Sequence, residues 1–327
     1  MLKNPDIDIA PSLLEGLRLV STPTAPAYLM SQGCNHAYAI GIPAQVLDLG
    51  QTMVGRARTL RFLPKREDLL KDQYSNVGDR PHRDAIESIQ PGEVLVIDAC
   101  GSFEAGVVGD MYTRRVQELG GQGIVIDGCV RDMSTIATIG VPLFCKGMHG
   151  SGINRALMSA DFQQPISIGN TAVLPGDVLL GDADGVVVVP PHLVEGLVAY
   201  GIEHEVQERF TRLKLEEGHA LHEAYPPNAE LRPLYLEWRK SQPEYEQYPF
   251  AFTNEYHGPP RPQRPRRRPH RRLRRHRPDH RQRAGRPQRP RRRERHFRGE
   301  RQRADPHRSR PLGEAHRLLQ SQRQRPR

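Results

Sequence analysis

The sequence predicts an α/β domain, and the evidence comes from the middle of the chain. Three apolar, strand-like runs occur at Glu93–Asp98, Gly123–Asp127 and Val141–Cys145. Two segments of helical character, Gly109–Leu119 and Arg131–Ile139, separate them. Strand–helix–strand–helix–strand order within about fifty residues is typical of an α/β domain with at least some parallel strands. We therefore expect parallel pairing in this region.

The flanking regions predict further elements. We expect short loops or turns at Ala99–Gly101 and Gly128–Val130, directly after two of the central strands. On the N-terminal side we expect a short amphipathic helix, a Ser/Thr/Pro loop, an alternating strand and a short helix at Pro11–Leu19, Ser21–Pro26, Val54–Phe62 and Arg83–Ser88. On the C-terminal side Pro175–Pro190 predicts two strands joined by an acidic turn. A long charged helix at Leu193–Glu217 follows, and Gly218 should stop it.

Charge divides the chain into two parts. Residues 261–327 contain 27 arginines, no lysine and five acidic residues, a net charge of +22. Because the whole chain carries +10, residues 1–260 carry −12. We therefore expect a single folded domain over residues 1–257, with an N-terminal arm and a C-terminal helix. A disordered Arg/Pro-rich tail over residues 258–327 should follow it.

The tail is open to three interpretations. Clustered arginine attracts phosphate, so the tail could bind nucleic acid. It could instead be a disordered appendage without function. The third interpretation, which we favour, is an out-of-frame reading of a GC-rich gene, because Arg, Pro, His, Gln, Ala and Gly share C/G-rich codons and lysine is absent. The acidic body gives no reason to expect nucleic-acid binding outside the tail.

Cysteine usage and the N-terminal sequence indicate a cytoplasmic protein. Four cysteines (Cys34, Cys100, Cys129 and Cys145) are widely spaced, without a Cys-x-x-Cys pair, so we expect reduced thiols. The first residues show no basic segment followed by an apolar run, unlike a signal peptide. The longest apolar runs have strand length, so we expect no membrane span.

The residues that indicate chemistry are Asp110, Arg131 and Asp132. Asp110 opens one predicted helix, and Arg131 and Asp132 open the next. Loops that follow strands and open helices gather at one edge of an α/β sheet, where ligands bind. Two carboxylates suit a hard divalent cation such as Mg²⁺ or Mn²⁺. Arginine is suited to hold a substrate carboxylate through two hydrogen bonds.

The backbone at the start of the first of these helices adds a second feature. The N–H groups of Met111 and Tyr112 should be available to an anion there. The residues alone also allow a simpler interpretation, in which Asp110 caps its helix and Arg131 and Asp132 form a surface ion pair.

These motifs resemble the family that contains 4-hydroxy-4-methyl-2-oxoglutarate aldolases and RraA-like proteins. Its active enzymes carry an Asp, twenty residues and then Arg-Asp, and here residues 111–130 make twenty. Thr22-Pro-Thr-Ala, Pro91–Asp98 and Pro175–Pro190 fit as well. The resemblance covers roughly residues 10–225, with an insertion around Lys65–His82. It implies a swivelling-domain-like β/β/α fold and a homotrimer or hexamer whose pocket lies between subunits.

The resemblance also implies roles for individual residues. Asp132 would ligate the metal, and Asp110 would hold metal-bound water. Arg131 would bind a 2-oxo acid, assisted by Gly109 and by the N–H groups of Met111 and Tyr112. A neighbouring subunit would supply one more acidic residue from a late helix, for which Glu205 and Glu208 are candidates, although a solvated charged face is the simpler interpretation of either.

The implied reaction cleaves a 4-hydroxy-2-oxo acid between carbons 3 and 4 and leaves a pyruvate enolate. Oxaloacetate decarboxylation leaves the same enolate. A divalent cation and Arg131 would stabilise its negative charge, and water held by Asp110 would take the 4-hydroxyl proton. Lys146 raises the alternative of Schiff-base chemistry, but a lone Lys before Gly is more often a surface residue.

Other candidate sites are weaker. His219 and His222 could belong to a zinc site, but a solvated pair is the simpler interpretation without a third ligand. Gly106–Gly109 and Gly150-Ser-Gly152 do not lead into Gly-Lys-Ser/Thr, so neither is a phosphate loop. His149 is better interpreted as a packed loop histidine than as a pocket residue.

The resemblance leaves a second function open. Some RraA-like proteins bind and inhibit an RNA-degrading endonuclease, as ribonuclease activity regulators without catalysis. In those proteins the position of Asp110 is typically not acidic, so the acid in this chain favours the enzyme. The distal group of the substrate is left undefined, and the Lys65–His82 insertion is a candidate determinant of it.

Overall fold

The computed structural model describes residues 2–69, 80–242 and 245. The predicted tail, residues 258–327, and the middle of the Lys65–His82 insertion lie outside the described residues. The helices and strands given below all belong to one compact unit.

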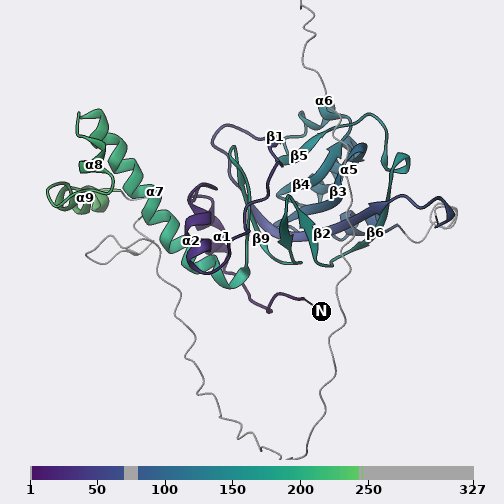
Figure 1. Cartoon of the computed structure of the whole chain (residues 1–327), viewed down its shortest axis with the longest axis horizontal. Coiled ribbons are helices and arrows are strands. Elements are labelled where there is room, and N and C mark those ends of the chain that lie inside the picture. Colours follow the sequence, from purple (N-terminus) through teal and green to yellow (C-terminus); the bar gives the residue numbers. More distant parts are fainter. Residues whose placement is uncertain (1, 70–79, 243–244, 246–327) are drawn as a thin grey trace, which may run out of the picture. The chain divides into compact units, whose positions relative to one another are not determined.

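A mixed, nearly closed sheet of eight strands forms the centre of the domain (Figure 1). Strands β2 to β5 run parallel to one another in the order β5-β4-β3-β2, which confirms the predicted parallel pairing and the α/β class. Antiparallel strands flank them: β1 pairs with β5, β6 and β9 pair with β2, and β10 pairs with β9. The strands span Ala44–Val46 (β1), Met53–Pro64 (β2), Glu93–Val108 (β3), Gly123–Val130 (β4), Leu143–Met148 (β5), Leu157–Phe162 (β6), Val178–Asp182 (β9) and Gly185–Val189 (β10), and a separate hairpin pairs Ile166–Ile168 (β7) with Thr171–Val173 (β8).

The helices connect these strands or follow them. The predicted long helix is confirmed, and Gly218, with φ of +95°, follows its end as expected. The helices span Pro11–Leu17 (α1), Ala25–Ser31 (α2), Pro81–Glu87 (α4), Asp110–Glu118 (α5), Met133–Ile136 (α6), Val194–Glu216 (α7), Leu221–Ala224 (α8) and Leu231–Lys240 (α9).

Two of the central strands are longer than predicted. Ala99–Gly101 lies within β3, where Cys100 and Gly101 have φ of 58° and 63° and the register against β4 shifts. Gly128–Val130 likewise belongs to β4. Small residues in these segments show no apolar periodicity. Ala99–Gly101 is a bulge between paired positions, whereas Gly128, Cys129 and Val130 pair with Ser102, Gly106 and Val108 and continue the sheet. The extension brings β3 and β4 together up to Val108 and Val130.

One predicted helix is much shorter than expected. Arg131–Ile139 contains only the single turn of α6, Met133–Ile136. At its start, Asp132 has a left-handed φ of 59° and cannot be part of a right-handed helix. At its end, the N–H groups of Thr138 and Ile139 donate to carbonyls three residues back, so the chain continues as tight turns and not as α-helix. Within the described residues the sequence analysis also missed β1 and β6 to β8, as well as α8, α9 and α2, whose first residue lies inside the predicted Ser21–Pro26 loop.

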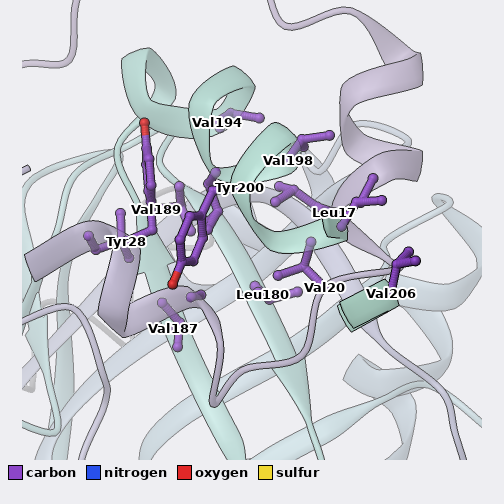
Figure 2. Close-up of a cluster of buried hydrophobic side chains, with 14 of the residues drawn as sticks. Leu17, Val20, Tyr28, Leu180, Val187, Val189, Val194, Val198, Tyr200 and Val206 are labelled. Carbon is purple, nitrogen blue, oxygen red and sulfur yellow. The ribbon is translucent and has the colours of Figure 1, made fainter. Parts of the chain in front are cut away.

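The hydrophobic core fixes the helices on the sheet. Leu17 and Val20 pack with Val198 of α7 and with Leu180 and Val187 of β9 and β10 (Figure 2). Each such fully buried aliphatic side chain contributes about 1.5–3 kcal/mol. A second cluster packs α4, α5 and α6 against β3 and β4, and its members include Ile86, Val116, Ile136, Leu95 and Ile126. This second cluster holds the start of α5 at the end of β3.

The length and composition of the helices bear on membrane crossing. Within the described residues, no helix combines the length and the apolar character that a bilayer crossing requires.

Candidate active site

The predicted site residues meet where β3 and β4 end. Val108 and Val130 are partners in the parallel ladder, and the N–H of Arg131 donates to the carbonyl of Val108 over 3.0 Å. Asp110 therefore opens α5 beside the segment that carries Arg131 and Asp132. This juxtaposition agrees with the expectation that loops after neighbouring parallel strands gather at one edge.

Gly109 lies in close contact with the side chains of Arg131 and Asp132. A Cβ atom at this position would be 2.7 Å from Oδ2 of Asp132 and 3.1 Å from Nε of Arg131. The backbone of Gly109 is extended, with φ of −122°, so its geometry does not require glycine. The side chains of Asp132 and Arg131 require it, because they occupy the space beside its Cα.

Arg131 and Asp132 also contact each other. Nε of Arg131 lies 3.3 Å from Oδ2 of Asp132, and the two side chains are 47% and 41% exposed. An exposed ion pair of this kind contributes about 0–1 kcal/mol. Either group can therefore exchange its partner for a ligand at little cost in stability.

Asp110 makes a hydrogen bond that the sequence did not predict. Its Oδ1 accepts from the N–H of Met111 over 2.8 Å. Of the two N–H groups expected to receive an anion, that of Met111 is thus engaged by Asp110. A bound anion would have to displace the Asp110 carboxylate from it.

A pocket of about 620 Å³ opens beside these residues. Its size lies in the range of small-molecule sites. Five of the six predicted site residues line it, whereas Asp132 does not and lies next to the pocket, behind Gly109. The lining consists of Arg80, His82, Arg83, Gly106, Val107, Gly109, Asp110, Met111, Tyr112, Arg131, Ser151, Gly152, Ile153, Asn154 and Arg155.

The sequence analysis named His82 only as the end of the Lys65–His82 insertion, and the structure places its side chain in one wall of the pocket. Its Nε2 lies 3.2 Å from the hydroxyl oxygen of Tyr112, and its Nδ1 lies 3.2 Å from Oγ of Ser159. Burial, together with the nearby charges of Arg83 and Arg80, lowers the pKa of His82 to about 4. His82 is therefore neutral near pH 7. No motif surrounds it in the sequence, so only the fold reveals its position.

The donor set fits a hard cation only in part. Asp110 and Asp132 offer carboxylate oxygens, the preferred ligands of Mg²⁺ and Mn²⁺, and the space beside Gly109 holds the Asp132 oxygen. Among the residues that the structure describes, no three His, Cys, Asp or Glu side chains come close enough to hold a metal. One chain thus brings two carboxylates to this point.

Glu205 and Glu208, the candidates for the additional acid, have partners within their own chain. Glu205 accepts hydrogen bonds from the Ser21 and Thr24 hydroxyls, each over 2.6 Å. It lines a second pocket, of about 540 Å³, together with Asp182. Glu208 lies 3.6 Å from Arg212. Neither lines the first pocket of its own chain.

The remaining candidates have structural partners. Lys146 lies 2.5 Å from Oδ1 of Asp127 and is largely buried, so its expected surface position was wrong. Lys146 is thus held by Asp127 and does not line the first pocket, which argues against a Schiff-base role. His149 accepts from the N–H of Ser151 over 3.0 Å and, as predicted, does not line the pocket. His219 lies 3.6 Å from Glu223.

Comparisons with known proteins place the chain in a family. Residues 30–188 match the RraA-like family, described as Aldolase/RraA. The "Putative 4-hydroxy-4-methyl-2-oxoglutarate aldolase" of Burkholderia mallei is 33% identical over 120 residues, which are 35% of this chain and 68% of that protein. Protein DlpA of Legionella pneumophila is 29% identical over 221 residues, 63% of this chain but only 34% of DlpA.

A solved structure agrees with these relatives. Streptomyces coelicolor RraAS2, described as an unusual member of the RNase ES inhibitor RraA protein family, superposes with a TM-score of 0.56 at 35% identity. The match covers 65% of this chain and 99% of RraAS2. Relatives of this chain are thus named either as aldolases or as inhibitors of an RNase. The chain belongs to the RraA-like family.

Proposed function

We propose that the protein is a lyase, dependent on Mg²⁺ or Mn²⁺, that cleaves 4-hydroxy-2-oxo acids to pyruvate and a carbonyl product. Oxaloacetate decarboxylation is a proposed second activity. The observation that carries the proposal is the position of the Asp132 carboxylate and the Arg131 guanidinium, 2.7 and 3.1 Å from one point beside Gly109. Asp110 lies next to that point and lines the pocket.

Arg131 is the proposed substrate anchor. Its Nε is close to Gly109, and its Nη1 would lie 3.4 Å from a Cβ atom at Gly152, so the guanidinium spans between two walls of the pocket. It would hold the carboxylate of the 2-oxo acid through two hydrogen bonds. Its fixed positive charge would also stabilise the negative charge that develops on the enolate.

Asp132 would hold the cation directly and Asp110 would hold it through water. When bound, the ion supplies a Lewis acid for the 2-oxo oxygen. Asp110, acting through a water molecule, takes the proton of the 4-hydroxyl group. The C3–C4 bond then breaks, its electron pair forms the enolate of pyruvate, and carbon 4 becomes the carbonyl of the second product. Protonation of carbon 3 completes the reaction.

We propose a homotrimer or hexamer, because the described part of one chain brings two carboxylates to the site and a neighbouring subunit can supply a third. The four cysteines are free, which supports a reducing, cytoplasmic location as part of the proposal.

A coupled assay for pyruvate release tests the lyase. The purified protein is offered a panel of 4-hydroxy-2-oxo acids and oxaloacetate, with Mg²⁺ and with a chelator. We expect pyruvate from at least one substrate and loss of the activity with the chelator. Release of no pyruvate from any substrate under metal-loaded conditions would retire the proposal.

The alternative function is that of an inhibitor of an RNA-degrading endonuclease, favoured by the likeness to RraAS2. It predicts binding to the endonuclease and no pyruvate release. The Asp110 carboxylate in the pocket wall favours the lyase, because a binding surface has no need of an acid placed beside Arg131 and Asp132.

A further inference from the structure

The pocket carries positive charge that its own chain does not neutralise. Besides Arg131, it is lined by three more arginines: Arg80 and Arg83 at the start of α4, and Arg155 after Gly152. Among the described lining residues, Asp110 carries the only carboxylate. Residues 1–260 carry a net charge of −12, so the four guanidinium groups in this pocket are opposite in sign to the net charge of that part of the chain.

These arginines differ from others in the chain in how they are paired. Arg58, Arg61 and Arg115 each contact a carboxylate, of Glu93, Asp161 and Glu87 respectively. In contrast, Arg80, Arg83 and Arg155 make no ion pair within the part of the chain that the structure describes. The Nε of Arg80 is buried there without a hydrogen-bond partner. A buried donor of this kind destabilises the protein unless a ligand accepts its hydrogen bond.

The low pKa of His82, which lines the same pocket, reflects burial and the positive charge of the neighbouring arginines. His82 lies between Arg80 and Arg83 in sequence, and both of them contribute to the low pKa of His82. It is therefore neutral near pH 7 and bridges Tyr112 and Ser159. The positive charges available to a ligand on this side of the pocket are thus those of the arginines.

The number of guanidinium groups indicates the kind of anion. One guanidinium pairs fully with one carboxylate through two parallel hydrogen bonds, and Arg131 is sufficient for the 2-oxo acid end. Three further guanidinium groups match a dianion with three terminal oxygens, which is the charge and valence of a phosphate monoester.

We propose that Arg80, Arg83 and Arg155 form a subsite for a phosphate monoester at the far end of the 2-oxo acid. The proposal rests on the proposed lyase function and specifies its substrate class: phosphorylated 4-hydroxy-2-oxo acids. Arg131 holds the carboxylate next to the reacting carbons, and the three arginines hold the phosphate. Binding energy at the remote phosphate then helps to orient the C3–C4 bond.

Two substrates that differ only in the phosphate test this subsite. One is a six-carbon 4-hydroxy-2-oxo acid phosphorylated on carbon 6, and the other is the same acid without the phosphate. We expect kcat/KM for pyruvate release to be roughly 100-fold higher for the phosphorylated acid, as two or more charge-assisted hydrogen bonds would give. A third acid, with a carboxylate at carbon 6, distinguishes the two anions, and turnover of it that equals or exceeds that of the phosphorylated acid would overturn the phosphate assignment.

Variants locate the preference. Arg80→Gln and Arg83→Gln should each reduce the ratio of kcat/KM between the phosphorylated and the unphosphorylated acid by roughly tenfold. Arg114→Gln is the matched control, because Arg114 is exposed on α5, pairs with Gln117 and does not line the pocket. An unchanged ratio in both pocket variants would contradict the subsite.

A binding measurement separates this inference from the lyase itself. Calorimetry should show tighter binding of the phosphorylated acid to the wild-type protein than to Arg80→Gln, whether or not pyruvate is released. Absence of pyruvate release with this difference intact would remove the lyase and keep the subsite. Pyruvate release with equal binding to both proteins would keep the lyase and remove the subsite.

Discussion

His82 and Tyr112 come from segments 30 residues apart, yet Nε2 of His82 lies 3.2 Å from the hydroxyl oxygen of Tyr112. The two rings meet edge to face, with centroids 5.8 Å apart. The contact joins the start of α4 to the first turn of α5 and so closes the pocket on one side. His82 can make it in the neutral form that its low pKa ensures.

Stability should depend on pH through His82. Its pKa is about 4 in the folded protein, against an ordinary value of 6.5 for histidine, so the unfolded chain binds more protons between these values. The contribution of neutral His82 to the free energy of unfolding should therefore be complete above pH 6.5. It should fall, on the order of 2 kcal/mol, as pH drops from 6.5 towards 4. Urea titrations of wild type and His82→Gln should differ in this window. His36→Gln, an exposed histidine, should follow wild type, and identical pH profiles for wild type and His82→Gln would refute the role of His82.

Gly109→Ala should damage the site without damaging the fold. The new methyl group would displace the Asp132 and Arg131 side chains, while the extended backbone accepts alanine. A displacement of about 1 Å at reacting groups costs roughly 100-fold in rate, so kcat/KM for pyruvate release should fall by about that factor. Gly150→Ala, which places a methyl group in open space, is the control. Equal kcat/KM in Gly109→Ala and wild type would argue against a functional role of the Asp132–Arg131 contact.

Asp110→Asn should separate the two proposed reactions. It keeps the shape of the side chain and removes the charge that assists deprotonation of the 4-hydroxyl group. Proton-transfer assistance is worth roughly 10²–10⁴-fold, so aldol cleavage should slow by about that much. Oxaloacetate has no hydroxyl proton to lose, so its decarboxylation should slow less. An equal loss in both reactions would show that Asp110 acts in some other step.

Arg131→Lys should impair both reactions, since lysine cannot reproduce the two parallel hydrogen bonds to a carboxylate. We expect KM for the 2-oxo acid to rise and kcat/KM to fall by roughly tenfold or more, the loss of about one charge-assisted hydrogen bond. Arg114→Lys, also exposed but outside the pocket, should match wild type. Steady-state kinetics measure both parameters. Wild-type values of KM and kcat/KM in Arg131→Lys would contradict the proposal that Arg131 holds the substrate carboxylate.

The buried pair of Glu203 and Arg239 should be critical for stability. The side chain of Arg239 is 4% exposed and that of Glu203 2%, with Nε 3.4 Å from Oε2, and Tyr235 donates to the same carboxyl. Burial raises the pKa of Glu203. Arg239→Met would leave this carboxyl without its cation and should reduce the free energy of unfolding by about 3–5 kcal/mol. Arg212→Met, at the exposed pair with Glu208, should cost about 0–1 kcal/mol. Chemical denaturation measures both losses. Equal losses in the two variants would show that burial of Glu203 adds no cost when its arginine is removed.

The sequence by itself determined the order of the central elements and named the candidate residues that the fold brings together. Apolar periodicity located β2 to β5, α5 and α7, because these elements bury one face or both. Chain order also placed Asp110 and Arg131 at neighbouring strand ends, since loops that follow parallel strands share an edge. The spacing of Asp110 from Arg131-Asp132 carried the resemblance to the family that the comparisons then confirmed.

Only the tertiary structure decided the details of the site. Cys100 and Gly101 form a bulge within β3, between the paired positions Asp98–Asp127 and Ser102–Gly128, and local sequence does not indicate that the strand resumes after it. Asp132 lies between β4, which ends at Val130, and the one-turn helix α6, in a left-handed conformation that sequence periodicity does not encode. His82, Arg80 and Arg155 reach the pocket through packing between segments far apart in sequence. Contacts of that range depend on the whole sheet being formed, so no local pattern could have predicted them.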